Sequence, residues 1–155
     1  MQKILTLNSL SGHEVTSDRA DKNTLAKFRN KLDSVCIQHK ILRFSELIDY
    51  SHLSFERGEI PYPEGISSND EFMAEHGKWF DAGKVYNQLS DLRNEVQRKP
   101  MRFGFLKNHY DQVLLELDEC IKFTKMASDE ALQVNFSEVI VGEWGRLGRP
   151  LFGGL

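Results

Sequence analysis

Long apolar segments are missing from this sequence. Its uninterrupted apolar runs are only two or three residues long, whereas a helix that spans a bilayer needs roughly 20 mostly apolar residues. The N-terminal stretch MQKILTLNSLSGHE has one lysine and an interrupted apolar run, which is too weak for a signal peptide. We therefore expect a cytoplasmic protein that has no membrane partner.

The usual signatures of catalysis and metal binding are also absent. The chain has only two cysteines and no CxxC, and no histidine stands three or four residues from another, the spacing that places two ligands on one helical face. No GxSxG, P-loop or dinucleotide-binding pattern occurs. Cys36 and Cys120 fall inside helical patterns, which predicts buried thiols. We expect no catalytic residues, no cofactor and no metal.

The composition is that of an ordinary globular protein. The 155 residues are 40% hydrophobic and 28% charged, which suits a single domain over residues 1–155 with a core of its own. The one basic cluster of the C-terminal half, QRKPMR, coincides with a predicted helix C-terminus, where cations are common. Nucleic acid is therefore not an expected partner.

Helical periodicity dominates the chain. It predicts helices over 24–40, 69–77, 82–99 and 104–126, with a helical turn near 44–50. Asn69 and Asp81 are predicted N-caps. The helix 104–126 has an apolar stripe that includes Leu106 and Leu117, and an outer face that includes Glu116.

Strand patterns are few. Residues 4–7 form one short candidate, and 132–137 alternate between apolar and polar residues, so we expect these two segments to pair. Residues 11–23 read as a loop, and 142–155 form a glycine-rich tail. The predicted fold is α+β and mainly helical, with three to five helices and a small two- or three-stranded sheet.

The acidic residues are concentrated in one segment. Residues 46–75 hold eight acids and one arginine, while 1–45 are basic and 76–155 are balanced. Within this segment, 51–70 form a long connection without periodicity, and such connections are often functional. An acidic surface attracts cationic partners. The candidate partner-binding residues are Glu46, Asp49, Phe55, Glu56, Glu59, Tyr62, Glu64, Asp70, Glu71, Phe72 and Glu75.

A second cluster lies at residues 76–81. His76, Lys78, Trp79 and Asp81 follow one another closely, as at the rim of a catalytic pocket. A structural interpretation is favoured, because Asp81 precedes a helix and Trp79 is a large apolar side chain at a helix junction.

The order of these segments resembles a group of small uncharacterised bacterial proteins. The resemblance is carried by LAKFRNKL, ILRFSELIDY, KWFDAGKVYNQLSDLRNEV, YDQVLLELDECIKFTKMA and LQVNF, over about residues 24–137. Such proteins are often encoded beside polymorphic toxins, including those of contact-dependent growth inhibition, and act as immunity proteins. The N-terminal 23 residues and the tail depart from the pattern.

The resemblance implies a non-enzymatic immunity protein that neutralises a cognate toxin domain. A basic toxin domain would be the partner of the acidic segment, and the protein would be a monomer or a weak homodimer. Two alternatives stay open: a small enzyme with a pocket near 74–81, and a regulatory or oligomeric subunit that associates through its helix stripes.

Overall fold

The fold is built on one mixed β-sheet. The computed structural model describes residues 2–56, 58, 60–142 and 145–146. The sheet has the order β2-β1-β5-β3, and two further short strands, β4 and β6, pair with β5. The strands are β1 (Gln2–Ser11), β2 (Glu14–Ser17), β3 (Ile48–Asp49), β4 (Phe80–Asp81), β5 (Gln133–Gly142) and β6 (Gly145–Arg146).

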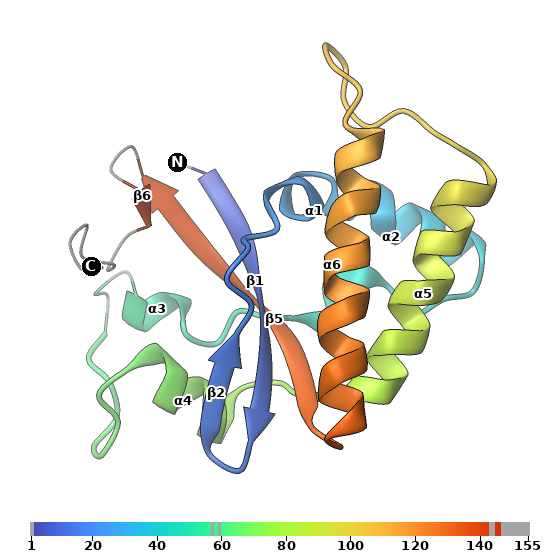
Figure 1. Cartoon of the computed structure of the whole chain (residues 1–155). Coiled ribbons are helices and arrows are strands. Elements are labelled where there is room, and N and C mark those ends of the chain that lie inside the picture. Colours follow the sequence, from blue (N-terminus) through green and yellow to red (C-terminus); the bar gives the residue numbers. More distant parts are fainter. Residues whose placement is uncertain (1, 57, 59, 143–144, 147–155) are drawn as a thin grey trace.

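The sheet lies between two sets of helices (Figure 1). One set comprises α1 (Asn23–Lys27), α2 (Arg29–Gln38), α5 (Ala82–Arg98) and α6 (Tyr110–Asp129), together with the 3-10 helix η1 (Phe44–Leu47). The other comprises the shorter α3 (Leu53–Glu56) and α4 (Asn69–His76). Only the first set encloses the main apolar core.

The expectation of three to five helices and a two- or three-stranded sheet was wrong. The described residues form six α-helices and six strands. The predicted loop 11–23 instead contains β2, which completes a hairpin with β1, and the turn contains Gly12 at φ +63°. Strand β2 escaped prediction because it is polar and mostly exposed, with no apolar alternation. Strands β3 and β4 have two residues each, too few to show any period.

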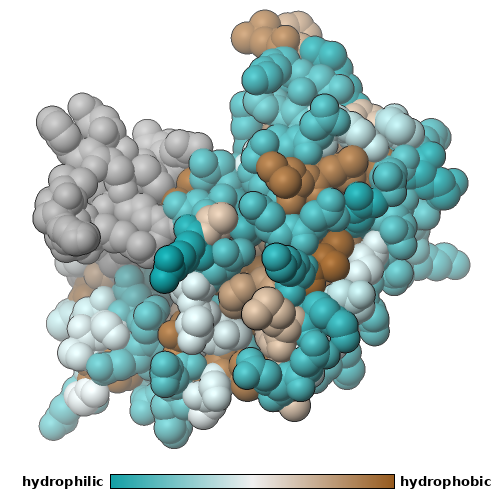
Figure 2. All heavy atoms as spheres, viewed as in Figure 1, coloured by the Kyte–Doolittle hydropathy of each residue, from teal (hydrophilic) through white to brown (hydrophobic). Residues whose placement is uncertain are grey.

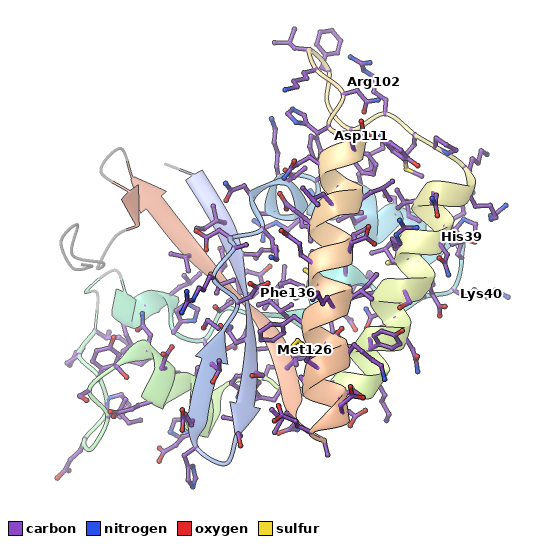
Figure 3. The ribbon with its side chains drawn as sticks, viewed as in Figure 1. His39, Lys40, Arg102, Asp111, Met126 and Phe136 are labelled. Carbon is purple, nitrogen blue, oxygen red and sulfur yellow. The ribbon has the colours of Figure 1, made fainter. Side chains whose placement is uncertain are left out.

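The predicted pairing of the two longer strands is confirmed. Strands β1 and β5 run antiparallel, with Leu7 opposite Phe136 and Ile4 opposite Val139. Leu5, Leu7 and Phe136 belong to the apolar core, and the Phe136 ring lies 5.2 Å from that of Phe44. Figure 3 shows Phe136 between the sheet and α6.

The helix predicted over 82–99 is confirmed as α5. Five apolar residues on one of its faces are buried, and Asp81 is the predicted N-cap, with its side chain accepting a hydrogen bond from Lys84 N. Because the stripe is packed inside the chain, it is not available to form an oligomer. The buried residues are Ala82, Val85, Leu89, Leu92 and Val96.

Three helix predictions need correction. The helix over 24–40 is interrupted at Phe28, which lies between α1 and α2. Helix α6 begins at Tyr110 rather than 104, and Leu106 is 92% exposed. Ser68, rather than Asn69, caps α4, since its hydroxyl accepts a hydrogen bond from Glu71 N at 3.1 Å.

Strand β5 is covered on both faces. Its alternation suggested a half-buried strand, but Asn135 and Ser137 are 1% and 6% exposed. Asn8 of β1 donates hydrogen bonds to both side chains at 3.0 Å, and Ser17 of β2 donates to Asn8 at 2.6 Å. This polar network makes burial of the second face tolerable, because each buried amide has partners. Met73 of α4, 4.0 Å from the Asn8 amide, packs over the network.

Candidate functional site

Helix α4 is a capped helix that carries part of the acidic segment. Ser68 caps its N-terminus, and Glu71 accepts hydrogen bonds from Ser67 N and Ser67 Oγ at 3.0 Å each. Asp70 and Glu71 also lie in its first turn, where the helix dipole favours negative charge. The helix buries Met73 against the sheet, so its acidic side faces solvent on a fixed support.

The three predicted aromatic anchors contact one another. The Phe55 ring lies 5.2 Å from that of Tyr62, in a stacked arrangement, and 4.5 Å from that of Phe72. The Tyr62 hydroxyl donates a hydrogen bond to Asn69 Oδ1 at 2.6 Å. All three rings are half-buried. Their main role is therefore to hold α3, the following connection and α4 together, and only their outer edges are available to a partner.

The predicted acids are distributed over several environments. Glu64, Asp70, Glu71 and Glu75 are exposed, and we call them the α4 acidic surface. Of the other candidates, Glu46 of η1 pairs with Arg43 at 3.1 Å, while the Glu56 and Glu59 side chains are outside the described residues.

Asp49 does not suit a docking surface. It is 4% exposed, and its carboxylate accepts hydrogen bonds from Ser51 N at 3.2 Å and Ser51 Oγ at 2.9 Å. The sequence placed it in the acidic segment, within a predicted helical turn near 44–50, whereas it belongs to β3 beside the central strand. Burial removes it from the reach of a partner.

The connection 51–70 is also more ordered than the sequence indicated. It contains α3, and α4 begins at its end. Periodicity could not reveal α3 because a four-residue helix has barely one turn. The segment is therefore both a structural layer over the sheet and the bearer of the acidic side chains.

The cluster at 76–81 is engaged in structural contacts. Trp79 Nε1 donates a hydrogen bond to the Met73 carbonyl at 2.8 Å, and Asp81 caps α5. The His76 ring packs 5.0 Å from that of Phe72, and Lys78 Nζ lies 5.6 Å from the centre of the Phe80 ring. These contacts turn the side chains toward different neighbours, which favours the structural interpretation of this cluster.

An open groove of about 690 Å³ lies between the end of α2 and α5. Figure 3 shows His39 and Lys40 at its α2 side. His39 Nδ1 lies 2.8 Å from Glu95 Oε2, and Arg98 binds the same carboxylate through two nitrogens at 3.0 and 2.8 Å. The Arg98 hydrogen bond is the main cause of the lowered Glu95 pKa. The polar groups at this end of the groove are thus already paired with each other.

Sequence reasoning missed a partly buried polar cluster at the start of α2, in which Glu138 and His52 are buried. Arg29 Nη1 lies 2.6 Å from Glu138 Oε1 and 3.1 Å from the Tyr50 hydroxyl. His52 Nε2 donates a hydrogen bond to the Glu138 carbonyl at 3.0 Å, and burial lowers the His52 pKa. Burial is the largest single effect on Arg29 and lowers its pKa, but the hydrogen bond and charge of Glu138, together with Tyr50, outweigh it, so the Arg29 pKa is raised. No sequence pattern joins residues more than a hundred positions apart.

The two cysteines are buried, as predicted, and neither is paired in a disulfide. Burial raises the pKa of the Cys36 thiol to about 11 and also raises that of Cys120. Both thiols are therefore protonated at neutral pH, which makes them poor nucleophiles and poor metal ligands.

Comparisons of this chain with protein-family models, curated proteins and solved structures find no match. Within the described ranges, no group of three or more His, Cys, Asp or Glu side chains is arranged to hold a metal ion. The described helices also include none with the length and apolar character to cross a membrane.

Proposed function

We propose that this protein is a non-enzymatic binding protein that docks a basic protein domain through the α4 acidic surface. In keeping with the resemblance of its sequence to small bacterial proteins, the partner would be a cognate toxin domain, which this chain neutralises in the cytoplasm as an immunity protein. The observation that carries the proposal is the exposure of four carboxylates on and beside one well-supported short helix.

Charge supports this assignment. Glu64, Asp70, Glu71 and Glu75 lie within twelve residues of the sequence, and the same stretch contains no Lys or Arg. Exposed charges act over about 10 Å at 0.1 M salt, so neighbouring carboxylates on one helix add their fields. Such a field speeds association with a cation-rich partner more than it strengthens the final complex.

Preorganisation supports it as well. The Phe55, Tyr62 and Phe72 rings and the Ser68 cap fix α4 before any partner arrives. A surface that is already ordered loses little conformational entropy on binding. The half-buried edges of the three rings would supply the apolar contacts beside the charges, as aromatic residues commonly do at interfaces.

The test is a charge-neutralising triple variant, Glu64→Gln, Asp70→Asn and Glu75→Gln. Glu71 is left unchanged because it binds Ser67 and its loss would disturb the helix start. We expect the association rate with the toxin domain encoded beside this chain to fall roughly tenfold or more at low salt, with a flatter salt dependence. Surface-based kinetics at two ionic strengths measures both quantities.

A matched control removes three charges from the opposite set of helices. Asp91→Asn, Asp111→Asn and Glu130→Gln change exposed acids on α5, at the start of α6 and just beyond its end. This variant has the same net charge as the test variant, so it should retain most of the wild-type association rate. Equal rates in the two triple variants would assign the effect to overall charge and refute docking at α4. Failure of the wild type to bind the toxin domain would refute the proposal outright.

A further inference from the structure

The connection between α5 and α6, residues 99–109, forms a protrusion beyond the N-terminal end of α6 (Figure 1). Phe105 and Leu106 lie next to each other in this protrusion, and each is 92% exposed. Figure 2 shows the hydrophobic residues at its end, separated from the rest of the surface by hydrophilic residues. Two adjacent large apolar side chains that are exposed to water indicate a binding surface.

The protrusion is braced from within. Phe103 is fully buried, and its ring meets that of Phe28 edge-on, with 5.6 Å between the ring centres. Phe103 N donates to Asn108 Oδ1 at 2.9 Å, and His109 N donates to the Phe103 carbonyl at 2.7 Å. The tip is therefore presented in a defined shape, and its exposure is a consequence of that shape.

Arg102 pairs with the backbone at the tip. Its Nε donates to the Gly104 carbonyl at 2.9 Å, and its Nη2 donates to the Phe105 carbonyl at 3.0 Å. Figure 3 shows Arg102 in the protrusion, above the first turn of α6 marked by Asp111. An unpaired carbonyl is costly in an apolar medium, and this pairing removes that cost for the Gly104 and Phe105 carbonyls.

Gly104 makes the turn possible. Its φ is +109°, and a Cβ at this position would lie 2.4 Å from the Lys107 carbonyl oxygen. Only glycine fits such a conformation and such a close backbone approach. The turn sends residues 105 and 106 outward together.

Positive charge surrounds the tip. From Arg98 to His109 the sequence has four Lys or Arg residues and no acid. Arg98 is paired with Glu95, but Lys99, Arg102 and Lys107 are exposed, and Lys31 of α2 donates a hydrogen bond to the Arg102 carbonyl. We call Lys31, Lys99, Arg102 and Lys107 the cationic collar.

We propose that Phe105 and Leu106 insert into the interface of a membrane that contains anionic lipids, with the cationic collar at the level of the phosphates. Apolar insertion and attraction to anionic lipids act together in this mode of binding. This mode of binding requires no membrane-spanning helix. It therefore departs from the sequence-based expectation of no membrane partner, which was based on the lack of long apolar runs.

The shape of the tip favours a lipid surface over a protein pocket. Two side chains of this kind bury on the order of 300–400 Å². A specific protein interface needs roughly 1,000 Å² or more, whereas lipid chains can surround a narrow convex tip on all sides. The paired carbonyls of Gly104 and Phe105 suit the lipid environment in particular, because lipid tails offer no hydrogen-bond donors.

The test uses large unilamellar vesicles of phosphatidylcholine, pure or with about 30% phosphatidylserine, since anionic lipid attracts Lys and Arg. The full chain should co-sediment with the phosphatidylserine vesicles and be released by salt. The double variant Phe105→Ser/Leu106→Ser should lower the partition coefficient at least about tenfold, because both apolar groups are lost. Lys99→Gln/Lys107→Gln should lower it roughly tenfold on the anionic vesicles.

Two further variants make the result specific. Ile37→Ser removes another exposed apolar side chain, 63% exposed on α2, and should bind vesicles as the wild type does. Phe105→Trp places a reporter at the tip, and its emission, after subtraction of the wild-type signal, should shift to shorter wavelength with the anionic vesicles. Circular dichroism melting curves show that each variant is folded.

Three results would overturn the proposal. The first is a wild-type protein that does not bind the phosphatidylserine vesicles, and the second is wild-type binding by the folded Phe105→Ser/Leu106→Ser variant. The third is a wild-type dimer in light scattering that the same variant converts to monomer, since a second copy would then cover the tip. Because these measurements involve no toxin domain, they succeed or fail independently of the function proposed for α4.

Discussion

A carboxylate of α6 holds the start of α1, and its removal provides a sharp test of the fold. Glu116 is 3% exposed, and its Oε1 accepts hydrogen bonds from Thr24 N and Leu25 N at 3.0 Å each. Its Oε2 accepts another from Gln112 Nε2 at 3.2 Å. Residue Lys22, at the N-cap position of α1, provides no side-chain cap. Glu116, which lies on a different helix, therefore accepts the hydrogen bonds that an N-cap side chain of α1 would otherwise accept.

The need for such a cap follows from the length of α1. The helix has only five residues, whereas isolated helices below about 12–15 residues are marginal in water. The free N–H groups at its start need acceptors, and a carboxylate there also interacts favourably with the helix dipole. Without Glu116, Leu25 N would remain near an apolar core with no acceptor.

Glu116→Gln keeps the size of the side chain and one acceptor oxygen but removes the charge. Hydrogen bonds to charged groups contribute about 1.5–3 kcal/mol and neutral ones about 0.5–1.5 kcal/mol, so this change should lower the free energy of unfolding by about 1–2 kcal/mol. Glu116→Ala removes both acceptors and should cost more, about 2–4 kcal/mol, because buried donors lose their partners. Urea denaturation followed by circular dichroism measures both losses.

Asp118→Asn is the matched control, because it neutralises an acid on the same helix. Asp118 is exposed and pairs with Arg93 at 2.7 Å. An exposed pair of this kind contributes about 0.2–1 kcal/mol. If Glu116→Gln costs no more than this control, with an unchanged urea m-value, the carboxylate does not cap α1 and the reasoning is refuted.

Three other predictions follow from the described contacts. Asp81→Ala should lower stability by about 0.5–2 kcal/mol through loss of the α5 cap while toxin binding is retained, and loss of binding without loss of stability would instead give the 76–81 cluster a functional role. Cys36, whose thiol pKa is raised from 9.0 to about 11 by burial, should resist a thiol reagent at pH 8 until the chain unfolds, and fast labelling of the native protein would contradict its burial. Burial lowers the His52 pKa below its ordinary value of 6.5, so the unfolded chain binds this proton more readily than the folded chain, and stability should fall as the pH drops below 6.5. His52→Gln should reduce the slope of stability against pH, measured as urea midpoints between pH 7 and 5. An unchanged slope would refute the assignment.

The sequence was most informative where a segment is long and one of its faces is buried. Helix α5 repeats apolar residues at three- and four-residue steps over seventeen residues, and its cap and end were readable from Asp81 and Pro100. The β1–β5 pair was also predictable, because both strands alternate on the side that meets the core. In these elements, the residues that the local periodicity places on one face are the same residues that the tertiary packing buries.

The sequence was misleading where an apolar pattern continues past the end of a helix. Leu106 is in phase with the stripe of α6, yet it belongs to the protrusion. Periodicity records spacing alone, and the break near Gly104 depends on a backbone conformation that spacing does not encode. Leu106, at the tip of the protrusion, was therefore assigned to the core-facing stripe.

For the acidic segment, the sequence was sufficient to identify the excess of charge but not its distribution between surface and interior. Glu64 and Glu75 lie on the exposed surface, whereas Asp49 is buried beside β5. The aromatic residues predicted as anchors pack mainly against each other. Charge is a property of composition, but exposure depends on which segments cover one another.

Contacts between distant residues were decided only by the tertiary structure. Glu116 was predicted on the outer face of its helix, yet its buried carboxylate accepts a hydrogen bond from Thr24 N, 92 residues earlier, in the first turn of α1. The pairing of Arg29 with Glu138 spans an even greater separation. Local periodicity extends over a few helical turns, whereas hydrogen bonds and ion pairs of this kind depend on how whole elements meet, and that is settled by the packing of the complete chain.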